Sequence, residues 1–292
     1  MKYNITAYST ALFSTWINVE ELNLLIDAGD GICSGLLQKS RKIKNVFITH
    51  PDRDHLTGLS QFVQLNSRAG FPKIYYPKDS GSFPALNNFL KKFDPHVSFS
   101  KWIAIKDKSR VEIKKNFVVE AIRNEHINCP LGIHKSLSYK VYDIKKKLKP
   151  KFQLKSNNEI KSIVKIEGKD FITEKTERNI ISFSGDTPVD DYSKWDGSET
   201  LIHEATFLQE ENNSQIEYRK NKHSKIDEVL KMVKEIKIDN LILNHFSSRY
   251  SKEEIDSAVR NLLNKYKIYV PVYLIYPGEI KRDILRSKPI NE

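Results

Sequence analysis

Cysteine is scarce in this chain, since the 292 residues include only Cys33 and Cys129. Two cysteines do not build a disulfide framework, so we expect a protein of a reducing compartment, the cytoplasm. The sequence also lacks an apolar run long enough to cross a membrane. Positions 1–16 lack the charged-then-apolar layout of a signal peptide. These absences predict a cytoplasmic protein that has no membrane partner.

Linkers and internal repeats are also missing. No Gly/Ser-rich stretch and no obvious repeat divides the sequence, so we expect one domain over residues 1–292. Hydrophobic residues make up 39% of the chain, which is enough for a sizeable core. The formal net charge of +11 suits a polyanionic partner such as RNA. A lysine-rich surface that binds nothing is an equal alternative on charge alone.

Histidine and aspartate are concentrated in the segment His50-Pro51-Asp52-Arg53-Asp54-His55. This segment follows an apolar strand predicted at 46–49 and precedes a helix predicted from Leu56, so we expect it on a loop. Imidazole and carboxylate groups are the ligands of hydrolytic zinc and of related metals. The alternative is a solvated loop in which a histidine caps the helix. Four such side chains within six residues favour the metal site.

An apolar strand that ends at a metal-binding type of residue recurs along the chain, at His50, His126, Asp186, His203 and His245. Strand ends gather at one edge of a layered fold, so these side chains can meet although they are far apart in sequence. For His203, which lies just inside a strand end, a structural hydrogen-bonding role is at least as well supported. Strands outnumber helices in each half, which fits two facing sheets covered outside by helices.

The segment 144–178 is the most charged part of the chain and includes the lysine-rich run 145–151. It has no regular apolar pattern. A flexible insertion and a set of exposed edge strands both fit this composition.

These motifs resemble those of the metallo-β-lactamase superfamily, and within it those of ribonuclease Z, the tRNA 3′-processing endonuclease. Segment 50–55 resembles the superfamily's His-x-His-x-Asp-His motif, and Gly185-Asp186-Thr187 resembles the motif of its bridging aspartate. The His-Glu-Ala-Thr of 203–206, the His-Ser of 223–224 and the segment 244–250 resemble motifs of ribonuclease Z. The resemblance implies an α/β (α+β) fold, the αββα four-layer sandwich, with a dinuclear metal site.

The resemblance also implies a role for each matching residue. Seven would be metal ligands: His50, Asp52 and His126 for one ion, Asp54, His55 and His245 for the other, and Asp186 as the bridge. Three would be catalytic: Asp54, which would orient the nucleophilic water, and the pair Glu204 and His223 near the leaving group. Ser247 and Arg249 would position phosphate or support the ligand loop. A hydroxide bridging the two ions would attack the phosphodiester.

The implied function is therefore a metal-dependent hydrolase that cleaves phosphodiester bonds in RNA, with precursor tRNA as the substrate. It would hold two divalent ions, zinc in preference to manganese, and the resemblance suggests a homodimer. Two features depart from the family's pattern. Asp52 stands where the family usually has histidine, which adds negative charge and favours harder metals such as Mn²⁺. Segment 144–178 lies where the family carries a tRNA-clamping arm, but it is short and lacks that arm's Gly-Pro tip.

Two other functions stay open at this point. The same site would suit hydrolysis of another bond, such as that of a cyclic nucleotide, a lactone or a thioester. The chain would alternatively be a metal-poor binding protein that lost catalysis through Asp52.

Overall fold

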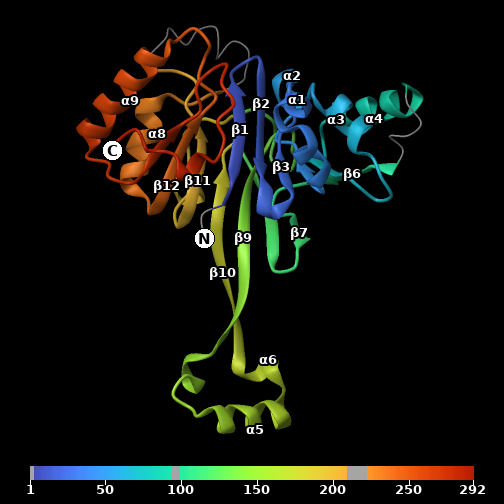
Figure 1. Cartoon of the computed structure of the whole chain (residues 1–292), viewed down its shortest axis with the longest axis vertical. Coiled ribbons are helices and arrows are strands. Elements are labelled where there is room, and N and C mark those ends of the chain that lie inside the picture. The colour runs from blue at the N-terminus through green and yellow to red at the C-terminus, as the bar shows by residue number, and fades with distance from the viewer. Residues whose placement is uncertain (1–2, 94–98, 209–221) are drawn as a thin grey trace.

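The computed structural model describes residues 3–93, 99–208 and 222–292. Within these residues the strands form a six-stranded sheet and a seven-stranded sheet that share one buried apolar cluster. Helices lie on the outer side of each sheet (Figure 1). The αββα sandwich expected from the sequence is confirmed. No helix of the described residues is long and apolar enough to cross a membrane.

The first sheet holds its strands in chain order. The first three strands pair antiparallel and the following ones pair parallel. Its outer face is covered by helices whose buried residues include Leu59, Phe62 and Phe83. The elements of this half are β1 Ile5–Thr10, β2 Ser14–Val19, β3 Leu24–Ile26, α1 Ile32–Leu36, β4 Asn45–Phe47, α2 Arg53–Leu56, α3 Leu59–Asn66, β5 Lys73–Pro77, α4 Ser82–Phe93 and β6 Lys101–Ile105.

The second sheet has the strand order β13-β12-β11-β10-β9-β8-β7. Strands β10 to β13 run parallel, and β7 to β10 pair antiparallel. The outer face is covered by α8 and α9, whose apolar residues pack on β11 and β12. The elements are β7 Arg110–Lys114, β8 Phe117–Arg123, β9 Leu137–Leu148, α5 Asn157–Glu167, α6 Lys169–Ile172, β10 Thr173–Phe183, β11 Ser198–Glu204, α8 Ile226–Glu235, β12 Ile238–Asn244, α9 Lys252–Tyr266 and β13 Val272–Leu274.

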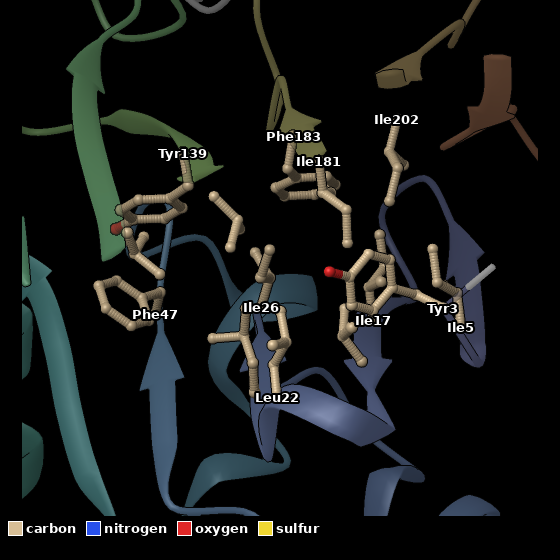
Figure 2. Close-up of a cluster of buried hydrophobic side chains, with 14 of the residues drawn as sticks. Tyr3, Ile5, Ile17, Leu22, Ile26, Phe47, Tyr139, Ile181, Phe183 and Ile202 are labelled. Carbon is tan, nitrogen blue, oxygen red and sulfur yellow. The ribbon is translucent and has the colours of Figure 1, made fainter. Parts of the chain in front are cut away.

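The main core lies between the two sheets. Ile17 and Phe47 of the first sheet belong to the same buried cluster as Tyr139 and Ile202 of the second sheet. Figure 2 shows these side chains pointing toward one another across the gap between the sheets. The Tyr139 hydroxyl donates a hydrogen bond to the Ile48 carbonyl, at 2.6 Å. This bond ties β9 to the segment that leads from β4 to the histidine-rich motif, so the core fixes the position of that motif.

The helix predicted from Leu56 begins earlier and is divided. It starts at Arg53 as α2, so Asp54 and His55 lie on a helical turn and not on a loop, which corrects the sequence expectation. Asp52 has extended backbone angles and is the residue before the first turn. The break between α2 and α3 lies at Thr57 and Gly58, and Gly58 packs so closely on the segment after β3 that a Cβ atom there would lie 2.1 Å from the Gly29 carbonyl oxygen.

The charged segment 144–178 forms a regular arm. The outer halves of β9 and β10 pair antiparallel from Asp143↔Arg178 to Leu148↔Thr173. Figure 1 shows this two-stranded ribbon extending away from the sheets and ending in α5 and α6. The exposed strands that the sequence allowed for this segment are found. The apolar alternation is missing because most side chains of this ribbon face solvent. The single-domain organisation of residues 1–292 stays a prediction.

Candidate metal centre

Strand ends bring the predicted side chains to one edge of the sandwich. His50 follows β4, His126 follows β8 and Asp186 follows β10. Glu204 is the last residue of β11, and His245 comes directly after β12. Because β10, β11 and β12 run parallel, their carboxyl ends lie at the same edge of the sheet.

The seven predicted ligands form connected groups. In each group the possible ligand atoms lie within 4.8 Å of one another. Two of the groups are the sets expected from the sequence, and a third connects them through Asp186: His50, Asp52 and His126; Asp54, His55 and His245; and His50, His55 and Asp186.

Asp186 lies between the two expected sets. Its Oδ2 atom is 3.6 Å from His50 Nε2, 3.2 Å from His55 Nε2 and 3.4 Å from His245 Nε2. One carboxylate oxygen thus faces imidazoles from both sets, and the side chain is buried. This is the position that a bridging carboxylate needs in a dinuclear site.

Three imidazole nitrogens at this centre have no hydrogen-bond partner among the described residues. They are the Nε2 atoms of His50, His55 and His126, and all three side chains are fully buried. A buried polar atom without a partner is costly in a folded protein, unless the atom binds a ligand. The imidazole and carboxylate donors that surround these atoms fit divalent metal ions.

Thr49 and Asp27 fix the orientation of two of these rings. The Thr49 hydroxyl donates to Asp27, so it accepts from Nδ1 of His50 at 2.9 Å. Asp27 Oδ2 accepts from Nδ1 of His55 at 2.8 Å. In the neutral form of each ring the proton is therefore held on Nδ1 and the lone pair is on Nε2, which is the tautomer that binds metal. Asp27 was missed in the sequence, although it ends an apolar strand as the predicted ligands do.

The charges of the centre support one another. Burial raises the pKa of Asp186, but His245 and His55 outweigh it and hold this pKa well below its ordinary value. Burial likewise raises the pKa of Asp54, but His55 and His245 outweigh it, so this pKa also falls. The pKa of Asp52 is lowered, chiefly by His126. The three carboxylates are therefore ionised at neutral pH, as metal ligands must be.

The histidines differ in charge. Burial, with His55 and His126 nearby, lowers the pKa of His50 well below its ordinary value. Burial also lowers the pKa of His55, but the carboxylates of Asp186, Asp27 and Asp54 outweigh it and raise this pKa well above its ordinary value. The cluster therefore attracts positive charge to the point where the carboxylates converge.

Glu204 and His223 form the polar pair expected from the sequence. His223 Nδ1 lies 3.2 Å from Glu204 Oε1, and the same carboxylate accepts from the Thr206 hydroxyl. Burial lowers the pKa of His223, but Glu204 and Asp186 outweigh it and raise this pKa to about 9. His223 is therefore protonated at neutral pH. Its Nδ1 atom lies 3.9 Å from Asp186 Oδ2.

Thr206 connects this pair to the ligand groups, which the sequence did not reveal. Its hydroxyl donates to Glu204, so it accepts from Nδ1 of His245 at 2.9 Å. His245 therefore directs Nε2 toward Asp54, whose Oδ2 atom is 3.4 Å away. One carboxylate, Glu204, thus orients both His223 and His245.

The remaining candidates lie at the border of the centre or outside it. His203 belongs to none of the ligand groups found in the described residues; its Nδ1 donates to the Glu204 carbonyl and its ring packs edge-on against Trp195. Arg249 donates from Nε to Ser247 Oγ at 3.0 Å. The Arg249 guanidinium also lies over the ring of Phe207, which in turn contacts His223.

Comparison with known sequences finds proteins named ribonuclease Z. The chain is 28% identical to ribonuclease Z of Methanocaldococcus jannaschii over 287 residues, which cover 89% of each chain. It is 28% identical to ribonuclease Z of Bacillus licheniformis, over 88% of this chain and 89% of that protein. It is also 28% identical to a chloroplastic tRNase Z of Arabidopsis thaliana, over 90% of this chain and 73% of that protein. No family model matches the chain.

Comparison with solved structures confirms the fold. The metallo-β-lactamase fold protein YhfI of Bacillus subtilis superposes with a TM-score of 0.63 at 13% identity, over 96% of this chain and 99% of that one. Human tRNase Z, short form, superposes with a TM-score of 0.59 at 18% identity, over 95% of this chain and 98% of that one. The metallo-β-lactamase fold and the similarity to ribonuclease Z sequences, both expected from the motifs, are confirmed.

Proposed function

We propose that this metallo-β-lactamase-fold chain, similar to ribonuclease Z over most of its length, is a metal-dependent phosphodiesterase that cleaves RNA, with precursor tRNA as its substrate. The observation that carries the proposal is the convergence of seven ligand-type side chains, Asp186 among them, with three buried imidazole nitrogens that have no hydrogen-bond partner in the described residues. The Glu204–His223 pair beside them adds a proton donor.

Two divalent ions would be held at this centre, one by His50, Asp52 and His126 and the other by Asp54, His55 and His245, with Asp186 between them. When bound, such ions lower the pKa of a coordinated water and offset the charge of the phosphate oxygens. The chain's own residues supply the geometry. Asp54 lies where it can orient the attacking water, because its Oδ2 atom faces both His55 and His245.

His223 acts on the leaving group. Its imidazole is protonated and is held by the Glu204 carboxylate. A cation at this position stabilises the negative charge that develops on the departing oxygen and can donate a proton to it. Glu204 is buried and its carboxylate contacts His223 and Thr206, so we assign it the role of orienting His223 and not of attacking the substrate.

The metals that we propose are zinc, with manganese as the second choice. Both ligand sets contain two imidazoles and one carboxylate in addition to Asp186, which suits zinc. Asp52 adds a negative charge that an imidazole would not, and carboxylate oxygen is the ligand type that manganese prefers.

The arm and the net charge support an RNA substrate. The tip between the two strands, residues 149–172, carries six lysines and three acidic residues. Lys149 and Lys151 lie over the ring of Phe171 at this tip. Lysines neutralise phosphates, and an extended basic arm can reach phosphates far from the metal centre. The cytoplasmic location and the homodimer expected from the sequence stay predictions.

The decisive experiment uses the purified chain loaded with Zn²⁺ or Mn²⁺ and a precursor tRNA with a 3′ extension. We expect one cut at the 3′ end in the wild type and loss of at least a thousandfold in rate in Asp186→Ala, because the carboxylate between the two ligand sets is removed. The matched control is Asp239→Ala, since Asp239 is an exposed carboxylate at the opposite end of β12.

Three results would contradict the proposal. An unchanged rate in Asp186→Ala would exclude the bridging role. Intact RNA with cleavage of a cyclic nucleotide, a lactone or a thioester would assign the centre to another hydrolysis. Fewer than one bound ion per chain would indicate a metal-poor binding protein.

A further inference from the structure

The turn between β1 and β2 is fixed to the metal centre. The Leu12 amide donates to Asp54 Oδ2 at 3.0 Å, and the Ala11 amide donates to the Phe246 carbonyl at 3.2 Å. In addition, Ser9 Oγ accepts from the His245 amide at 3.1 Å. This hairpin therefore holds segments of both halves of the molecule, at the positions of two proposed ligands.

The backbone of the turn is held by these hydrogen bonds, but two of its side chains are exposed to solvent. Leu12 is 66% exposed and Phe13 is 62% exposed, whereas Asp54 beside them is 6% exposed. Leu12 also has a φ of +69°, a backbone conformation that costs a non-glycine residue of order 1 kcal/mol. Strain of this kind persists where surrounding contacts impose it, as they do here, and it is concentrated at functional sites. Two large apolar side chains are thus presented to solvent beside the proposed reaction centre.

The turn has little to offer a ligand except apolar surface. The Ala11 and Leu12 amides already donate to the Phe246 carbonyl and to Asp54, and the Phe13 amide donates to the Thr10 carbonyl at 3.1 Å. A phosphodiester bound at the metal centre carries a nucleoside on one or both sides. The flat face of a nucleobase is the part of RNA that stacks on aromatic and apolar side chains.

We propose that Leu12 and Phe13 form a platform that contacts a nucleobase next to the scissile phosphate. The proposal rests on the proposed phosphodiesterase function and adds to it a site that binds base rather than phosphate. Stacking on a platform is tolerant of base identity, so the platform determines where the chain is cut and not which sequence is cut.

Two substitutions remove the platform without disturbing the centre. Leu12→Gly keeps the amide that binds Asp54 and accepts the positive φ more readily than leucine does. Phe13→Ser removes the ring. The matched control is Phe89→Ser, because Phe89 is 61% exposed and lies on α4. Metal content is measured for every variant, since a purely structural role of the turn in holding Asp54 would change it.

The experiment compares cleavage of one precursor RNA with that of the same RNA carrying an abasic ribose on either side of the scissile phosphate. In the wild type we expect kcat/KM to fall about tenfold for one abasic position, the size of one stacking contact. The L12G/F13S double variant should cleave intact RNA with the same, about tenfold lower kcat/KM, and the decrease should come from a higher KM. Its kcat/KM should not fall further on the abasic RNA. Phe89→Ser should behave as the wild type.

Each other result overturns the proposal in a recognisable way. Equal cleavage of intact and abasic RNA by the wild type excludes a base contact. A double variant with lost metal or lower kcat shows that the turn only positions Asp54. A changed sedimentation mass shows that the turn contacts a second copy of the chain. If the wild type cleaves no RNA with either metal, the proposed function fails and the platform fails with it.

Discussion

Asp52 is the proposed ligand most open to solvent, with 41% of its side chain exposed. Its Oδ2 atom lies 3.7 Å from His50 Nε2 and 3.8 Å from His126 Nε2. It is therefore close enough to complete their ligand set, yet it is less constrained than the buried histidines. A substitution at Asp52 should change metal preference without unfolding the centre.

We expect Asp52→His to keep or tighten zinc binding and to weaken manganese binding about tenfold, because imidazole replaces a hard anionic oxygen. Equilibrium competition with a chelator measures both affinities. Asp239→His, at an exposed position, is the control. If the wild type, Asp52→His and Asp239→His show the same ratio of zinc to manganese affinity, Asp52 is not a metal ligand.

The charge of His223 depends on Glu204. In the metal-free protein the pKa of His223 is raised to about 9, above its ordinary value of 6.5. A raised pKa in the folded state means that the pair stabilises the fold fully below pH 6.5, and that this contribution is lost as the pH rises through about 9. Glu204→Gln should bring the pKa of His223 back toward 6.5, because the largest favourable charge is removed. NMR titration of the imidazole protons measures it, and an unchanged pKa would refute the pairing.

At the scale of elements, the ligand motif depends on how α2 and α3 pack against the segment after β3. Gly58 approaches this segment so closely that a Cβ atom would lie 2.1 Å from Gly29 O and 3.1 Å from Ala28 O. Both neighbours are backbone atoms, which cannot move aside as a flexible side chain would. The glycine is therefore required by packing and not by its φ.

Gly58→Ala should lower the free energy of unfolding by about 3 kcal/mol, the upper range for forcing a methyl group into a packed site. Gly81→Ala is the control, because a Cβ atom at Gly81 meets nothing within 4 Å. Urea denaturation measures the free energy of unfolding of both variants. Equal midpoints for the two variants would mean that the backbone at Gly29 moves to accommodate the methyl group without loss of stability.

Several elements could be predicted from sequence, and the reasons differ. Helices α4, α8 and α9 each bury apolar residues on one face, and such a stripe at helical spacing is visible in a sequence. The division of the helix after Leu56 was not predicted; it lies where Gly58 packs against Gly29, and a contact between distant segments leaves no local pattern in the sequence. The outer part of the β9–β10 ribbon has no buried face and therefore no alternation to detect.

At the scale of the whole molecule, the arm is separate enough to be removed. Leu148 and Thr173 are paired Cα partners at the end of the ribbon, so a two-residue Asn-Gly turn can join them in place of residues 149–172. We expect this variant to bind precursor tRNA about tenfold more weakly and with a smaller dependence on salt, because lysine–phosphate contacts are lost.

Hydrolysis of a small phosphodiester should stay unchanged in the same variant, since the arm supplies none of the residues of the metal centre. Fluorescence anisotropy at several salt concentrations and a chromogenic substrate measure the two properties. Unchanged RNA affinity would exclude the arm as a binding element and leave the charge of the main body as the source of affinity.

The sequence by itself indicated several of the proposed ligands, because these residues follow apolar strands and strand ends gather at one edge of the fold. His50, Asp186 and His245 were all found in this way. Only the tertiary structure decided that Asp27 and Thr206 orient the rings, because a hydrogen bond between distant segments leaves no periodic pattern. The same holds for the amide of Leu12 at Asp54: a backbone group has no sequence signal, and only the packing of the two halves places it there.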